Sequence, residues 1–252
     1  MHLTIVPELD NLNRQAADHA ARLLRQTIAS LGRARLVAAT GSSQIAFLEH
    51  LTRAPGIDWS KVELFHLDEY IGLGSDHPAS FCRFLRERLI EKTGILRFHL
   101  LDGLADPATV IREVGSALRT QPVDLLLAGI GENGHLAFNE PPADFTNRAP
   151  YFVVTLDAVS RRQQVGEGWF PRIEDVPTAA ITMSISQILQ AREILCLVHG
   201  RRKARAVHAC FAHDVTPDAP ASILRTHDAA TVYLDSEAAS TLPASRGGLA
   251  PG

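Results

Sequence analysis

The sequence predicts an α/β protein with an open, mostly parallel sheet and helices on both faces, a Rossmann-like three-layer sandwich. Short apolar runs alternate with segments of helical periodicity along most of the 252 residues. Several of these runs are apolar throughout, which is typical of strands buried on both faces. Strands that alternate with helices favour a parallel sheet with right-handed crossovers.

The elements follow from the same patterns, taken in chain order. Apolar runs predict strands at residues 3–6, 36–39, 62–67, 98–101, 123–128, 151–156, 179–183, 194–198 and 231–234. Helical spacing predicts helices at residues 9–31, 45–51, 78–90, 107–118, 200–213 and 221–224. Gly32 ends the first helix as a C-cap, and Pro78 and Pro107 suit the first turns of two others. The polar segment between the strands at 151–156 and 179–183 carries no predicted element.

Length and composition predict one domain at residues 1–242, followed by a flexible C-terminal tail at 243–252 that is rich in glycine and proline. A net charge of -3, without a basic run interleaved with aromatics, argues against nucleic acid as a partner. No stretch approaches the roughly 20 apolar residues of a membrane span, and the first residues do not resemble a signal peptide. We therefore expect a cytoplasmic protein.

Cysteine and histidine usage gives no sign of a disulfide framework or a metal centre. Cys82, Cys196 and Cys210 show no paired spacing and lie in apolar or helical surroundings, which favours buried, reduced thiols. The eleven histidines form no HExxH or similar ligand pattern. We expect no metal.

The loop after the predicted strand at 123–128 concentrates polar groups and glycines. Its glycines stand at 129, 131 and 134, and its polar residues include Asn133, His135, Asn139 and Glu140. The glycines match a dinucleotide-binding fingerprint, but the loop lies in mid-chain and Pro141 and Pro142 prevent the long helix that this fingerprint requires. Because glycine lets bare backbone N–H groups approach a ligand, the density of polar groups indicates a binding or catalytic site.

A second loop, Thr40-Gly41-Ser42-Ser43, joins the predicted strand at 36–39 to a helix. A glycine turn before a helix points free N–H groups and the positive end of the helix dipole at one place, which suits a phosphate. Serines there also cap helices very often, and the loop lacks the lysine of a P-loop. On this loop alone, phosphate binding and simple capping both remain open.

Two further charged positions follow predicted strands. Asp68 stands at the end of the strand at 62–67, and ligands of open parallel sheets bind at such carboxyl ends. Lys203 lies in the first turn of a helix, where its charge opposes the dipole unless an anion binds there. A solvated lysine and a surface carboxylate are the alternatives at these two positions.

Two long motifs resemble the signatures of one enzyme family. GIGENGHLAFNEP, at residues 129–141, resembles the signature loop of glucosamine-6-phosphate deaminases, and DEYIGLGSDHPASF, at 68–81, resembles the second signature of that family. The resemblance extends from about residue 36 to about 235. The related 6-phosphogluconolactonases share the Gly-His loop but usually continue differently, whereas Asn139-Glu140-Pro141 has the deaminase form.

The resemblance implies conversion of glucosamine 6-phosphate and water to fructose 6-phosphate and ammonia, without metal or organic cofactor. It implies that Asp68 is the enolisation base and that Asn133, His135 and Glu140 serve ring opening. It assigns phosphate and sugar binding to Thr40, Gly41, Ser42, Ser43, Gly131 and Lys203. Residue chemistry agrees, since a histidine titrates near pH 6.5 and an aspartate, ionised at neutral pH, accepts a proton from carbon.

Some positions depart from the family pattern. Some members carry aspartate at Asn133, glycines are usual at Ser184 and Ser186, proline is usual at Gln44, and residues 161–170 offer no clear phosphate-binding arginine. A lactone hydrolase of the 6-phosphogluconolactonase kind and a catalytically silent sugar-phosphate-binding regulator are the alternatives. A homo-oligomer is expected, and the choice between gluco and galacto amino sugars stays open.

Overall fold

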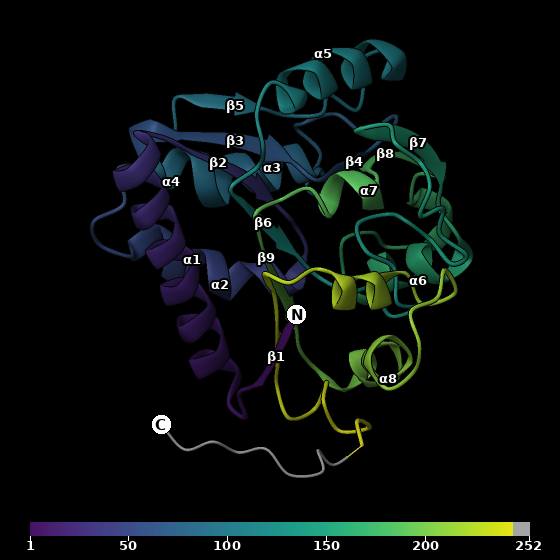
Figure 1. The fold of residues 1–252 in the computed structure, drawn as a ribbon. Helices are drawn as coiled ribbons and strands as arrows, with labels where there is room; N and C mark the ends of the chain where they lie inside the picture. Colours follow the sequence, from purple (N-terminus) through teal and green to yellow (C-terminus); the bar gives the residue numbers. More distant parts are fainter. Residues whose placement is uncertain (244–252) are drawn as a thin grey trace, which may run out of the picture.

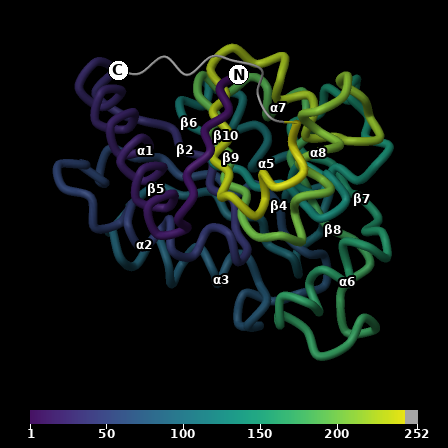
Figure 2. The backbone as a smooth tube through the Cα atoms, turned by 90° about the horizontal axis from the view of Figure 1, so that it is seen from below, coloured from purple at the N-terminus to yellow at the C-terminus, as the bar shows by residue number. Residues whose placement is uncertain are grey.

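The structure, a computed structural model, describes residues 1–243. The strands of its larger sheet are β1 (His2–Ile5), β2 (Ala34–Ala38), β3 (Val62–His66), β5 (Arg97–His99), β6 (Leu125–Ala128), β9 (Glu193–Val198) and β10 (Ala230–Leu234). They form a seven-stranded sheet in the order β1-β10-β9-β6-β2-β3-β5, with every neighbouring pair parallel. The first and last strands of the chain, β1 and β10, lie side by side (Figure 2).

Helices cover both faces of this sheet (Figure 1). The described residues form the α-helices α1 (Leu9–Leu31), α2 (Ile45–Arg53), α3 (Phe81–Leu85), α4 (Glu91–Thr93), α5 (Pro107–Arg119), α6 (Ala158–Gly166), α7 (Ile185–Ile188) and α8 (Ala204–Phe211). Alternate strand residues point to opposite faces, so Leu36 and Leu64 pack with α1 and α2 while Val37 and Phe65 pack with α5. Each such fully buried side chain contributes roughly 2 kcal/mol of hydrophobic stabilisation. The predicted α/β class and its covered parallel sheet are confirmed.

The direction in which the chain builds the sheet reverses between β2 and β6. From β2 the chain adds β3 and then β5 toward one edge, and from β6 it adds β9 and then β10 toward the other. The loops after β2 and β6 therefore part at the carboxyl edge of the sheet. Such a switch point is where open α/β sheets bind ligands.

A second, smaller sheet corrects the expectation that the strands share one sheet. It has the order β4-β8-β7 and is antiparallel, built from β4 (Asp68–Tyr70), β7 (Tyr151–Thr155) and β8 (Ala179–Met183). After the buried Tyr151, β7 alternates half-buried positions, Phe152 and Val154, with exposed ones, Val153 (48% exposed) and Thr155. Its apolar sequence hides this alternation, because valine stands at the outward position as well.

The helices differ most from the prediction in two segments. The helix expected from residue 78 begins at Phe81, because the Ser80 side chain accepts a hydrogen bond from the Arg83 N–H and so caps it. It continues through a π-helical stretch, Arg86–Ile90, into α4. α6 occupies the polar segment for which no element was predicted, and Asp157 caps it. Of the predicted tail at 243–252, residues 244–252 lie outside the described residues.

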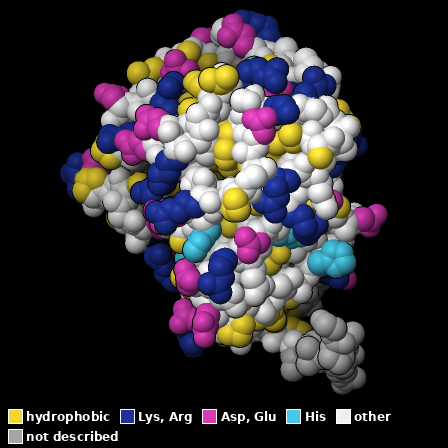
Figure 3. Space-filling model, turned by 90° about the vertical axis from the view of Figure 1, so that its left-hand side faces the viewer, with side chains coloured by type: hydrophobic (Ala, Val, Ile, Leu, Met, Phe, Trp, Pro, Cys, Tyr) yellow, Lys and Arg dark blue, Asp and Glu magenta, His cyan; other side chains and the backbone are white. Residues whose placement is uncertain are grey.

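Charges of both signs are interspersed on the face of the molecule shown in Figure 3. That view shows no large patch of one sign. Within residues 1–243, no helix is long and apolar enough to cross a membrane.

Candidate active site

A cleft opens at the switch point, at the carboxyl ends of β2, β3 and β6. It holds a cavity of about 80 Å³ that opens to solvent. Its walls include the predicted site residues Thr40, Gly41, Ser42, Ser43, Asp68, Gly131, His135 and Lys203. Residues that are up to 163 positions apart in the sequence thus meet at one place, because four parallel strands, β2, β3, β6 and β9, deliver them to the same edge.

Asp68 stands where the chain leaves the larger sheet for the smaller one. β3 ends at His66, and Asp68 begins β4, opposite Thr182 of β8. Its side chain is only 6% exposed, and no described residue forms a hydrogen bond with its carboxyl group. Burial, and secondly the neighbouring charge of Glu69, raises the pKa of Asp68 to about 8. The expectation that Asp68 is ionised at neutral pH is therefore corrected.

His135 faces the cleft from the loop after β6. Its ring packs directly over Gly131, where any Cβ atom would collide with the imidazole. Its backbone N–H donates to Asn133 Oδ1 at 3.1 Å, and its Nδ1 lies 2.9 Å from Ser160 Oγ. Position 131 thus requires glycine because the His135 ring approaches its backbone closely. The ring is held at Nδ1, which leaves Nε2 available to a substrate.

Glu140 and Asn133 lie behind the histidine, outside the wall of the cleft. Glu140 Oε2 is 3.5 Å from His135 Nδ1, and Asn133 Nδ2 donates to the same carboxylate oxygen at 2.7 Å. Burial acts to raise the pKa of Glu140, but His135 and the donors around the carboxylate hold it below its usual range. Glu140 and Asn133 thus fix the orientation of the His135 ring from behind.

Four cleft residues form a corner that suits an anion and is called the anion corner below: Gly41, Ser42, Ser43 and Lys203. The turn Ser42–Gln44 starts at Gly41, whose φ of 95° favours glycine, and it leads into α2. Among the described residues, the N–H groups of 41–43 donate to no protein acceptor. Lys203 is 8% exposed, and burial lowers its pKa. Free N–H groups at a helix start and a buried ammonium together suit a phosphate.

α6 supplies pocket residues that the sequence analysis missed. Gln163, Gln164 and Glu167 line the cleft, and Ser160 contacts His135 from the same face of the helix. Glu167 Oε1 accepts a hydrogen bond from Gln163 Nε2 at 2.7 Å. Burial acts to raise the pKa of Glu167, but Lys203 and several hydrogen-bond donors hold it low. These three residues follow Ser160 by three, four and seven positions, so they lie on the same face of a helix. This polar periodicity is a sequence signal that could have revealed the pocket residues.

The departures from the family pattern have local roles. Gln44 Nε2 donates to the Ala128 carbonyl and so joins the two switch-point loops. Ser184 caps α7 by accepting from the Gln187 N–H. Arg161 donates to the carbonyls of Ile173 and Val176, and it does not line the cleft.

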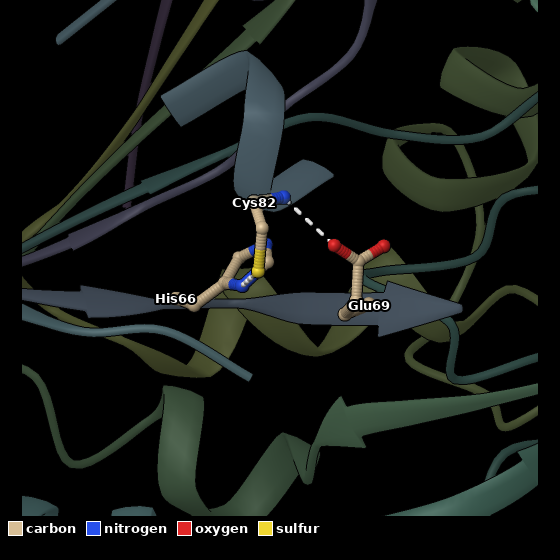
Figure 4. Close-up of side chains that lie close together, drawn as sticks. All are labelled: His66, Glu69 and Cys82. Atoms are coloured by element: carbon tan, nitrogen blue, oxygen red, sulfur yellow. Dashed lines mark hydrogen bonds between the residues drawn. The ribbon is translucent and has the colours of Figure 1, made fainter. Parts of the chain in front are cut away.

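His66, Glu69 and Cys82 lie close together beside the site (Figure 4). Glu69 accepts four hydrogen bonds, from the N–H groups of Tyr70, Phe81 and Cys82 and from the Ser80 hydroxyl. Its oxygens are therefore engaged in fixing the start of α3. This cluster holds β4, and with it Asp68, against α3.

The fold and this cleft define a class of α/β enzyme with a buried carboxyl group, a histidine and a buried lysine gathered at the switch point of its sheet. The family model for glucosamine-6-phosphate isomerases and 6-phosphogluconolactonases matches residues 7–233. The chain belongs to this family.

Individual relatives agree. The chain is 41% identical over 203 residues to a glucosamine-6-phosphate deaminase of an Exiguobacterium species, covering 80% of this chain and 78% of the relative. It is 34% identical over 243 residues to one of Lactobacillus delbrueckii subsp. bulgaricus, covering 96% and 100%.

Solved structures show the same fold. A monomeric glucosamine-6-phosphate deaminase superposes with a TM-score of 0.87 at 32% identity, covering 95% of this chain and 99% of that one. A 6-phosphogluconolactonase from Shewanella baltica superposes with a TM-score of 0.78 at 21% identity, covering 93% and 97%. The latter likeness concerns the fold alone.

Proposed function

We propose that this protein converts glucosamine 6-phosphate and water to fructose 6-phosphate and ammonia, by an aldose-ketose isomerisation coupled to deamination. The single observation that carries the proposal is the position of Asp68 in the cleft that also holds His135 and the anion corner. A reaction that moves a carbon-bound proton needs a base of this kind beside a ring-opening acid. Relatives that bear the deaminase name support the same substrate.

Phosphate binding comes first in the proposed reaction. The phosphate lies at Lys203 and the N–H groups of 41–43, where charge-assisted hydrogen bonds fix the sugar in one orientation. Thr40 and Gly131 line the cleft between this corner and the reacting end. This anchoring places the ring oxygen and C2 between His135 and Asp68.

Ring opening follows at His135. The histidine takes the proton of the C1 hydroxyl and gives a proton to the ring oxygen, so its own proton count is unchanged at the end of the step, and the Glu140 carboxylate orients the imidazole from behind. Asn133 fixes Glu140 and the backbone of the histidine. The product of this step is the open-chain aldehyde.

Asp68 then acts as the base. It removes the C2 proton to give an enolamine, and a proton returned to C1 gives an iminium at C2, to which water adds as ammonia leaves. The raised pKa of Asp68 makes it a stronger base than an ordinary aspartate, and the substrate ammonium next to it favours the ionised form. Lactone hydrolysis moves no carbon-bound proton and so gives Asp68 no comparable role.

The test is the release of ammonia and fructose 6-phosphate by the purified protein after chelator treatment. Galactosamine 6-phosphate and 6-phosphogluconolactone serve as parallel substrates. Turnover of glucosamine 6-phosphate supports the proposal, whereas hydrolysis of the lactone alone refutes it. Binding of glucosamine 6-phosphate without turnover would instead support a regulator. The cytoplasmic location, the homo-oligomer and the absence of a cofactor stay predictions.

A further inference from the structure

The carboxylate of Asp157, the N-cap of α6, lies behind the two groups that contact the back of His135. Ser160 Oγ contacts His135 Nδ1 at 2.9 Å, and Asn133 Oδ1 accepts from the His135 N–H at 3.1 Å. Asp157 holds both of these groups: Oδ1 accepts from the Ser160 N–H at 2.6 Å, and Oδ2 accepts from Asn133 Nδ2 at 3.1 Å. We propose that Asp157 is a positioning residue for His135 in the reaction proposed above, on which this inference rests.

The hydrogen-bond inventory of Asn133 shows why position 157 requires two acceptors. Asn133 spends one amide hydrogen on Glu140 Oε2 and the other on Asp157 Oδ2, and its oxygen accepts from the His135 N–H. Both amide hydrogens and the amide oxygen of Asn133 are therefore engaged in hydrogen bonds. Asn133 therefore lies as a neutral bridge between two carboxylates, which would repel each other without it.

An amide at position 157 cannot replace the carboxylate. If its oxygen caps the Ser160 N–H, its NH₂ group faces the NH₂ group of Asn133, donor against donor. If its oxygen turns to Asn133, its NH₂ group faces the Ser160 N–H instead. Either orientation breaks one of the two contacts, so Asp157→Asn separates the helix-capping role from the positioning role.

Asp157 does not line the cleft, so it acts on the substrate only through His135. Loosening Asn133 frees both the backbone of His135 and the carboxylate of Glu140 behind its ring. The anion corner at Lys203 and residues 41–43 has no contact with Asp157 among the described hydrogen bonds. Loss of the Asp157 contact to Asn133 should therefore lower kcat and leave KM unchanged.

The experiment compares Asp157→Asn and Asp157→Ala with Asp106→Asn as a matched control. Asp106 caps α5 by accepting from the Thr109 N–H at 2.9 Å, and it lies outside the cleft. Asparagine caps helices about as well as aspartate, so both asparagine variants keep their caps. The measurements are kcat and KM with glucosamine 6-phosphate, Tm, and calorimetric binding of glucosaminitol 6-phosphate, an open-chain analogue that needs no ring opening.

We expect Asp157→Asn to lower kcat by about ten- to hundredfold, a size typical of a slightly misplaced catalytic group. KM, Tm and analogue binding should stay near wild type, and Asp106→Asn should match wild type throughout. Asp157→Ala should lower kcat at least as much and lower Tm as well, because it also loses the cap. Retained analogue binding shows that the pocket of each variant is folded.

Two outcomes overturn the inference while the proposed function stands. In the first, Asp157→Asn turns over as fast as Asp106→Asn. In the second, Asp157→Asn loses activity only in step with Tm and analogue binding, which is a purely structural effect. A wild-type protein that does not act on glucosamine 6-phosphate refutes the proposed function, and the inference with it.

Discussion

Replacing Asp68 by asparagine removes the proposed base while keeping its size. Asp68 is buried and, among the described residues, unpartnered, so the change breaks no hydrogen bond to the protein. Without a base at C2, kcat should fall by about 10²- to 10⁴-fold, the usual contribution of general base catalysis. Binding of glucosaminitol 6-phosphate should persist, because Lys203 and residues 41–43 are untouched.

The same substitution should stabilise the fold. The pKa of Asp68 is about 8 in the folded protein, against an ordinary value of 3.8. Because the unfolded chain gives up this proton first, the stability of the folded state falls as pH rises from about 4 to about 8, at up to about 1.4 kcal/mol per unit. At pH 7 this loss of stability is at most about 4 kcal/mol. Asparagine does not ionise, so the variant does not suffer the loss.

Thermal unfolding of both proteins from pH 4 to pH 9 measures this difference. The advantage of Asp68→Asn in Tm should grow with pH and level off above pH 8, reaching several degrees. In parallel, kcat/KM of the wild type should rise with pH up to about 8, since the free enzyme must lose the Asp68 proton. A variant that is less stable than wild type across this range, or one that still exchanges the C2 proton, would refute the reasoning.

Three further predictions concern the neighbouring groups. His135→Gln should slow turnover by about 10²- to 10⁴-fold while glucosaminitol 6-phosphate binds as before; an equal loss of analogue binding would remove its ring-opening role. Lys203→Ala should raise KM roughly tenfold or more, whereas Glu167→Gln should lower KM about two- to fivefold by removing a like charge near the phosphate. Steady-state kinetics in which both substitutions shift KM in the same direction would contradict the anion corner. Glu69→Gln should lower stability in urea unfolding by about 1–3 kcal/mol, because an amide nitrogen then faces N–H donors at the start of α3; an unchanged midpoint would argue against this cap.

The strands that carry the site were predictable because their signal is local. Continuous apolar runs end just before residue 40, before Asp68 and before Gly129, and parallel strands present such ends at one edge. Their meeting at a switch point depends on the order of strands in the sheet, which no local pattern contains. The family signatures supplied the assignment of residues that local patterns left open.

Other features depend on burial and tertiary contacts. The raised pKa of Asp68 comes first from desolvation, and the sequence does not show how completely the junction of two sheets encloses that carboxyl group. α6 has few apolar residues, so its pocket face of Gln163, Gln164 and Glu167 carried no apolar period to detect. The bridge from Asp157 to Asn133 spans 24 positions and exists only in the folded chain.

The most direct test of the proposed reaction follows the C2 proton of glucosamine 6-phosphate by NMR while ammonia is measured in the same sample. With the wild type, the C2 proton signal should disappear in step with ammonia release and the appearance of fructose 6-phosphate, and with Asp68→Asn it should persist. A wild type that leaves the C2 proton in place while it opens 6-phosphogluconolactone would contradict the account.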